Sequence, residues 1–183
     1  MDSPPRPTQE SLVYLSLGSN LGDRRRNLVE ALREIDRSPN AVVRCSALYE
    51  TEPVDVREQP PFLNLVCALS CRQRPEGLLA TCRRTERALG RRQTFPKGPR
   101  VIDIDILFFD DRLIETPRLV VPHPRLQDRR FVLVPLAEIA AEFCDPRSQE
   151  TVASLLESCP DRSWVRDAGP IRWRSAADDA QRG

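Results

Sequence analysis

Two carboxylates on an otherwise apolar segment are the clearest sign of chemistry in this sequence. Asp103 and Asp105 alternate with Ile102, Ile104 and Ile106. Because successive side chains of a strand point to opposite faces, both carboxylates share one face, about 7 Å apart along the strand. That spacing suits oxygen ligands for hard divalent cations such as Mg²⁺. An edge strand with two solvated acids has the same pattern, so the pair alone does not identify a metal site.

The segment before this strand is rich in arginine. Between residues 83 and 100, Glu86 is the single acid among seven cations: Arg83, Arg84, Arg87, Arg91, Arg92, Lys97 and Arg100. Guanidinium groups bind phosphate oxygens through paired hydrogen bonds. Cations beside a diacid therefore predict a substrate that brings both phosphates and a divalent cation.

The elements that must position these residues follow the order β-α-β-β-α-β. Apolar patterns predict strands at 12–17, 41–49, 62–70 and 101–109, a helix capped by Asp23, and a second helix from Pro75 to Gly90. This order is typical of an α+β, ferredoxin-like fold, an antiparallel sheet with helices on one face. Beyond it we expect a C-terminal hairpin (113–114 with 119–121) and helices at 131–143, interrupted by Pro135, and at 152–158.

Length, composition and charge narrow the class of protein. The chain has 183 residues and a net charge of +1. We expect one domain, residues 11–167, between flexible tails at 1–10 and 168–183. The small net charge argues against binding to nucleic acid or membrane surfaces, and no apolar run could span a bilayer or serve as a signal peptide. A cytoplasmic monomer is the expectation.

The cysteines predict neither a zinc site nor disulfides. The six of them contain no Cys-x-x-Cys pair, and a single histidine accompanies them. We expect free thiols that fill the core of a protein in a reducing compartment: Cys45, Cys67, Cys71, Cys82, Cys144 and Cys159.

Several motifs together resemble those of the 6-hydroxymethyl-7,8-dihydropterin pyrophosphokinase family. The most specific is Lys97-Gly98-Pro99-Arg100, followed by Asp103-Ile104-Asp105. The others are Leu17-Gly18-Ser19-Asn20-Leu21-Gly22, Tyr49-Glu50-Thr51-Glu52-Pro53, Phe62-Leu63-Asn64, Glu86 before Gly90-Arg91, Val121-Pro122-His123-Pro124 and Arg129-Arg130-Phe131. The resemblance implies transfer of the β,γ-diphosphate of ATP to a pterin alcohol, with AMP as the second product, in folate biosynthesis.

The resemblance also implies roles around the phosphates. Asp103 and Asp105 are similar to the family's metal-binding aspartates, so two Mg²⁺ ions are the implied cofactor. Arg91 and Arg100 are similar to its phosphate-binding arginines and complete the catalytic set. The implied ATP site adds Glu86, which would orient an arginine, His123, a hydrogen-bond donor, and Arg129.

For the pterin, the resemblance implies a sandwich between Phe62 and Phe131, with the amide of Asn64 on the polar edge of the ring. Backbone groups near Thr51, Glu52 and Val54 would complete that edge. Without the resemblance, the two phenylalanines fit core positions equally well, since phenylalanine is commonly buried.

Two other classes of protein fit the predicted fold. A ferredoxin-like RNA-binding module would use the arginine-rich turn, but such modules stack bases on strand aromatics where this chain has Asp103 and Asp105. A small-molecule regulatory module of the same fold would bind a ligand without turnover. Without the resemblance, His123, held between two prolines, fits a structural hydrogen-bonding group.

Overall fold

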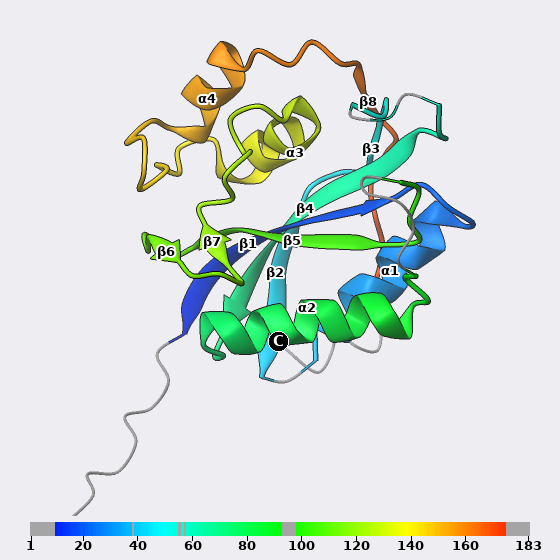
Figure 1. Ribbon diagram of the computed structural model, residues 1–183, viewed down its shortest axis with the longest axis horizontal. Coiled ribbons are helices and arrows are strands. Elements are labelled where there is room, and N and C mark those ends of the chain that lie inside the picture. The colour runs from blue at the N-terminus through cyan, green and yellow to red at the C-terminus, as the bar shows by residue number, and fades with distance from the viewer. Residues whose placement is uncertain (1–9, 38, 55, 57, 93–97, 175–183) are drawn as a thin grey trace, which may run out of the picture.

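Strand β1 (Ser11–Ser19) lies inside the sheet, and its apolar side chains are buried on both faces. It pairs antiparallel with β4 (Phe62–Cys71) and with β5 (Asp103–Phe109). Figure 1 shows these strands crossing the middle of the molecule. The computed structural model describes residues 10–37, 39–54, 56, 58–92 and 98–174.

Three shorter strands complete the sheet. They are β2 (Asn40–Cys45) and β3 (Tyr49–Thr51), which both pair with β4, and β8 (Val165–Asp167), which pairs with β3 at the edge. The strand order is β5-β1-β4-β3-β8, with β2 beside the other half of β4. The α+β fold with an antiparallel sheet is therefore confirmed.

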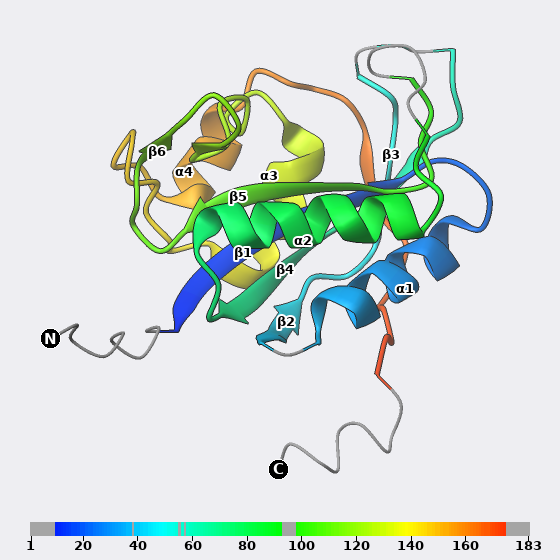
Figure 2. The same cartoon turned by 60° about the horizontal axis from the view of Figure 1, so that its bottom comes forward.

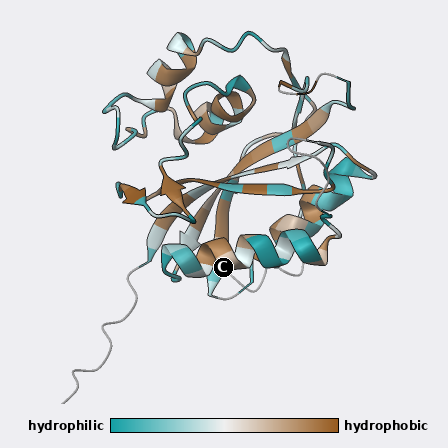
Figure 3. Cartoon of the chain, viewed as in Figure 1, coloured by the Kyte–Doolittle hydropathy of each residue, from teal (hydrophilic) through white to brown (hydrophobic). Residues whose placement is uncertain are grey.

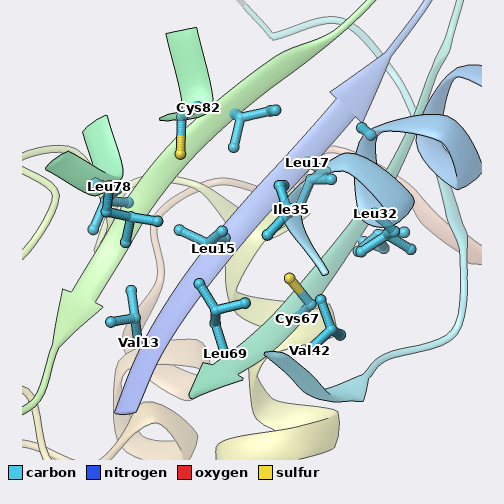
Figure 4. Packing of buried hydrophobic residues seen from close by; sticks show 14 of the residues in the cluster. Val13, Leu15, Leu17, Leu32, Ile35, Val42, Cys67, Leu69, Leu78 and Cys82 are labelled. Carbon is cyan, nitrogen blue, oxygen red and sulfur yellow. The ribbon is translucent and has the colours of Figure 1, made fainter. Parts of the chain in front are cut away.

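Helices α1 (Arg24–Ile35) and α2 (Pro75–Ala88) cover one face of the sheet (Figure 2). The carboxylate of Asp23 accepts a hydrogen bond from the backbone N–H of Arg26 and caps α1, as its sequence predicts. Between these helices and the sheet lies the larger core, part of which Figure 4 shows. Each fully buried leucine of such a core contributes roughly 1.5–3 kcal/mol through loss of exposed apolar surface.

Helices α3 (Arg130–Ala140) and α4 (Val152–Ser158) lie on the opposite face, where a second core forms beneath them (Figure 1). The predicted interruption at Pro135 is wrong, because α3 continues through it. A proline removes a single N–H donor from a helix. Pro135 is buried, and the apolar residues around it keep α3 packed on the sheet: Val132, Leu133, Leu136 and Ile139.

The predicted hairpin is present as β6 (Ile114–Glu115) paired with β7 (Val120–Val121). The predicted strand at 41–49 is instead two strands. At the break, the backbone N–H of Ser46 donates to the carbonyl of Val66. Leu48 turns away and exchanges hydrogen bonds with residues 168 and 169, so long-range pairing overrides the local pattern.

Residues 168–174 also differ from the expected flexible tail. Arg25 donates to the carbonyls of Ala168 and Pro170, and Arg33 donates to that of Trp173. Ile171 is buried in the larger core. The packed domain therefore extends at least to residue 174; residues 1–9 and 175–183 lie outside the described part.

Two further expectations concern membrane-spanning helices and the cysteines. Within the described residues no helix has the length and apolar character needed to cross a membrane. The cysteines contribute to the cores as expected with one exception, since Cys144 is exposed. Cys45 is half-buried at the end of β2.

Candidate active site

The sheet face under α3 is divided into an apolar half and a polar half. Tyr14, Val66 and Phe108 belong to the apolar half, which α3 and α4 cover. Farther along the same strands the face carries Ser16 and Asn64, and there it lines a pocket. The polar half is therefore a rigid floor, built on strands whose other half is anchored in the core.

Strand β5 delivers both carboxylates to this floor. Asp103 lies opposite Gly18 and Asp105 opposite Ser16, while Ile104 and Ile106 enter the core on the other face. The predicted alternation is thus confirmed, and Figure 3 shows it as teal and brown bands along β5. A register shift between Tyr14 and Leu15 of β1 ends the strict alternation farther along β5.

The Asp103 carboxylate is held by two arginines. Its Oδ1 lies 2.8 Å from the guanidinium of Arg91, and its Oδ2 lies 3.1 Å from that of Arg100. Burial raises the pKa of Asp103 and the nearby charge of Asp105 raises it further, against the opposing effect of the two arginines. A divalent cation bound near Asp103 and Asp105 would oppose this rise in pKa and favour the charged form of Asp103.

Glu86 fixes Arg91 from the second helix. Its carboxylate is paired with the Arg91 guanidinium and also accepts a hydrogen bond of 2.8 Å from the backbone N–H of Ile104. Burial raises the pKa of Glu86, while Arg91 acts in the opposite direction. Glu86 thus connects α2, β5 and the phosphate-binding arginine predicted from the sequence, as the orienting role requires.

His123 lies beside the second carboxylate. Its Nε2 is 3.8 Å from Asp105 Oδ2, and Arg129 reaches the same oxygen at 3.4 Å. Burial, together with the charge of Arg129, lowers the pKa of His123 to about 4, so the ring is neutral near pH 7. The backbone N–H of Arg125 donates to Nδ1, and the guanidinium of Arg129 lies 3.4 Å from Nε2.

All five residues predicted for the pterin line a single pocket together with the diacid. Besides Asp103, Asp105, Arg100 and Arg129, the lining contains Thr51, Val54, Phe62, Asn64 and Phe131. The lining does not include Glu86, Arg91 or His123, which are connected to the diacid strand by the contacts described above. Lys97 falls within 93–97 and lies outside the described residues.

The two phenylalanines are only partly buried, which distinguishes them from core residues. Each ring already has a guanidinium over its face, Arg100 at 5.4 Å from Phe62 and Arg129 at 5.7 Å from Phe131. Flat, accessible ring faces beside cations suit a planar, polar heterocycle.

Asn64 is fully enclosed at the floor of the pocket. Its Nδ2 donates a 2.8 Å hydrogen bond to Thr51 Oγ1. A Cβ on Gly18, the residue opposite on β1, would lie 2.4 Å from Asn64 Oδ1, so the position requires glycine. Gly18, which lies within β1, thereby shapes the pocket floor.

Some residues of the site were not predicted. Asn20 is nearly fully buried and connects its own turn to two other segments. Its backbone N–H donates to the carbonyl of Arg100, and its Oδ1 accepts from the backbone N–H of Arg100. Its Nδ2 donates to Gln59 Oε1 and to the Pro60 carbonyl. Ser16 and Gln59 also line the pocket. The Gly-Ser-Asn turn was the available signal for Asn20, but its partners are about 40 and 80 residues away.

The donor set fits a hard divalent cation. Asp103 and Asp105 offer carboxylate oxygens, the ligands that Mg²⁺ prefers. The described residues contain no cluster of three or more histidine, cysteine or acidic side chains suited to a metal. Such sites with one or two carboxylates are completed by water and substrate phosphates.

Comparison with known proteins agrees with this geometry. Residues 14–141 match the model of the 7,8-dihydro-6-hydroxymethylpterin-pyrophosphokinase family. A Bacillus subtilis 2-amino-4-hydroxy-6-hydroxymethyldihydropteridine pyrophosphokinase is 37% identical over 160 residues, covering 87% of this chain and 93% of its own length. The enzyme of the same description from Pseudomonas aeruginosa is 40% identical over 149 residues, covering 81% and 91%.

Longer relatives contain a similar region. The Pneumocystis carinii folic acid synthesis protein fol1 is 36% identical over 167 residues, which are 91% of this chain and 22% of that protein. The chain therefore spans about a fifth of this relative. A Plasmodium falciparum HPPK-DHPS structure with pterin and p-hydroxybenzoate has the same fold, with a TM-score of 0.65 and 18% identity over 83% of this chain and 43% of that one.

Proposed function

We infer that this chain, which belongs to the 7,8-dihydro-6-hydroxymethylpterin-pyrophosphokinase family, transfers the β,γ-diphosphate of ATP to the hydroxymethyl group of 6-hydroxymethyl-7,8-dihydropterin. The products would be AMP and the pterin diphosphate, an intermediate of folate biosynthesis. The observation that carries this proposal is a single pocket whose lining joins two carboxylates to accessible aromatic rings and a buried amide.

Recognition of the pterin would combine stacking with edge contacts. Phe62 and Phe131 supply ring faces, and Asn64 supplies a donor and an acceptor for a heterocycle that displays both. Thr51 and Val54 lie on the same lining. Since Thr51 already accepts from the Asn64 amide, the orientation of that amide is fixed before substrate binds.

The triphosphate would bind the basic side of the pocket. Arg100 is suited to it because its Nε is buried and has no hydrogen-bond partner among the described residues. Arg91, held by Glu86, and Arg129 add charge-assisted donors, and Nε2 of His123 lies on the same side, beside Asp105. These donors would spread over the phosphate oxygens, where negative charge collects during transfer.

Asp103 and Asp105 would hold Mg²⁺, which supplies charge neutralisation for the phosphates and lowers the pKa of a coordinated alcohol. The chain's own contribution is positional. The stacked ring places the hydroxymethyl oxygen for in-line attack on the β-phosphorus, and the arginines hold the chain of phosphates so that AMP leaves opposite. This transfer requires no covalent enzyme intermediate.

The RNA-binding alternative has less support. The strand face that would stack bases carries Asp103 and Asp105 at its polar end, and carboxylates repel phosphate unless cations intervene. A regulatory module that binds the pterin without turnover is separated from the enzyme by a product assay.

Phosphorus NMR of the purified chain with MgATP and the pterin tests the proposal. We expect AMP and a pterin diphosphate to accumulate in equal amounts. ADP as the main product would indicate an ordinary kinase, and intact ATP in the presence of bound pterin would indicate a regulatory module. The Asn64→Ala variant serves as a control, because it should raise the pterin concentration required without changing which phosphate bond breaks.

A further inference from the structure

Two cysteines face each other across neighbouring strands. Cys45, the last residue of β2, lies directly opposite Cys67 of β4. In the next pair along the strands, the backbone N–H of Ser46 donates to the carbonyl of Val66 at 2.9 Å, which marks a hydrogen-bonded pair. Hydrogen-bonded and non-hydrogen-bonded pairs alternate in antiparallel sheets, so Cys45 and Cys67 form the non-hydrogen-bonded kind.

This type of pair has the dimensions of a disulfide. Opposed α-carbons of a non-hydrogen-bonded pair are about 4.5 Å apart, and disulfides span roughly 4.4–6.8 Å between α-carbons. The Cys45 side chain opposite it, followed by burial, raises the pKa of Cys67 well above its ordinary value, so Cys67 is held as the neutral thiol. The spacing of the two strands therefore permits the bond.

Access to the two sulfur atoms differs. Cys67 is fully buried beside Val42 in the core under α1 (Figure 4), whereas Cys45 is half-buried at the end of its strand. A small oxidant would reach Cys45 first and Cys67 would then react within the protein. The exposed thiol of Cys144 is in a different part of the chain and provides an internal comparison.

We propose that Cys45 and Cys67 are an oxidisable pair that forms an intramolecular disulfide in the presence of a hydroperoxide. The Cys45 sulfur attacks one peroxide oxygen and becomes a sulfenic acid as the O–O bond breaks and the other oxygen leaves as water or alcohol. The Cys67 sulfur then attacks the Cys45 sulfur and releases one water. Two thiols lose two electrons in all, and the peroxide gains them.

The proposed disulfide would join the two ends of the segment that carries most of the pterin residues. The segment between the two cysteines carries Thr51, Val54, Phe62 and Asn64, four of the five residues that we assign to the pterin. Cys67 points into the core under α1, on the face opposite Asn64 and Val66. The disulfide would therefore close the base of the substrate-binding segment without entering the pocket, and would restrict that segment in the unfolded chain.

Thiol titration and peptide mapping of the full chain test the pair directly. After treatment with hydrogen peroxide and removal of the excess, we expect denatured protein to titrate four thiols in place of six. Mapping without reduction should recover the peptides of Cys45 and Cys67 joined, with a loss of two hydrogen atoms in mass. Dithiothreitol should restore all six thiols, and the oxidised chain should melt about 5–10 °C higher than the reduced one.

Two variants separate the pair from other thiol chemistry. Cys144→Ser should still lose two thiols, whereas Cys45→Ser should form no intramolecular disulfide. Oxidation confined to Cys144, or sulfinic acid at Cys45 with Cys67 still a free thiol, would overturn the proposal. The readouts are mass, thiol count and melting, so a failure of the proposed enzymatic activity would not be mistaken for a failure of the disulfide.

Discussion

Replacing Gly18 with alanine should damage the pterin site selectively. The new Cβ would lie 2.4 Å from Asn64 Oδ1, whereas ordinary contact begins at 3.4 Å, so the amide must retreat by about 1 Å. That movement breaks the 2.8 Å hydrogen bond from Asn64 to Thr51. A buried polar group left unpaired costs about 1–3 kcal/mol, which corresponds to a melting temperature lower by about 2–12 °C for a chain of this size.

The kinetic effect should follow the same geometry. Because the displaced amide is the proposed contact with the pterin edge, we expect the KM for the pterin to rise about 10–100-fold, the equivalent of 1–3 kcal/mol. The KM for ATP should stay within about twofold, since the atoms nearest to the new Cβ belong to Asn64 and Phe62, on the pterin side. Steady-state measurements with each substrate varied in turn would show this split.

Gly77→Ala provides the matched control. Gly77 lies inside α2, and a Cβ there meets Gln73 no closer than 3.6 Å, an ordinary contact. Alanine is better than glycine in a helix by about 1 kcal/mol, so this variant should melt slightly higher with unchanged kinetics. Equal pterin KM values for Gly18→Ala, Gly77→Ala and the parent chain would refute our account of the pocket floor.

Three further predictions follow from the site and its supports. Asp103→Asn and Asp105→Asn should each lower the turnover number by about 100-fold or more, while the far-ultraviolet circular dichroism stays unchanged. Chelation of Mg²⁺ should abolish turnover in the parent chain. Near-normal turnover in either variant would show that its carboxylate does not belong to the metal site. Glu86→Gln should raise the KM for ATP about tenfold, because Arg91 loses its charged partner while the amide oxygen can still accept from Ile104; an unchanged value would leave Glu86 a purely structural role. Both tyrosines should ionise above pH 10. Burial, followed by the hydrogen bond to Glu138, raises the pKa of Tyr49 to about 12, so the contribution of Tyr49 to stability is complete below pH 10 and is lost as the pH rises through 12. Phenolate absorbance that develops at pH 10 in the folded protein would contradict this expectation.

Local chemistry in the sequence was sufficient for much of the fold. Asp23 caps its helix, Pro75 begins the next one, and Gly90 adopts the positive φ expected just beyond its end. The isoleucine and aspartate alternation oriented β5 correctly. Each of these features depends on residues within a few positions of one another, which is the range over which sequence patterns carry information.

The features that were missed depend on distant partners. Strand β8 has three residues and exists because β3 offers it an edge, and the segment after it is held by arginines of α1. Asn20 acquires its role from segments around Pro60 and Arg100. The sequence alone did not reveal such pairings, and the resemblance to a family named the site residues without giving the bonds that hold them.

The register shift in β5 lets the strand tolerate a change in length at one position. Tyr14 faces Phe108 but Leu15 faces Ile106, so Leu107 is an extra residue in the ladder. Leu107 and Phe108 both contribute to the core under α3, whereas Ile106 and Phe109 contribute to the core under α1 and α2. Deleting Leu107 would therefore remove the bulge and restore strict alternation, with Asp103 and Asp105 still on the pocket face and Phe108 still opposite Tyr14. A frame-preserving deletion of this one codon would cost a buried leucine without exchanging the faces of the strand, whereas one residue inserted elsewhere in β5 would turn one end of the strand over.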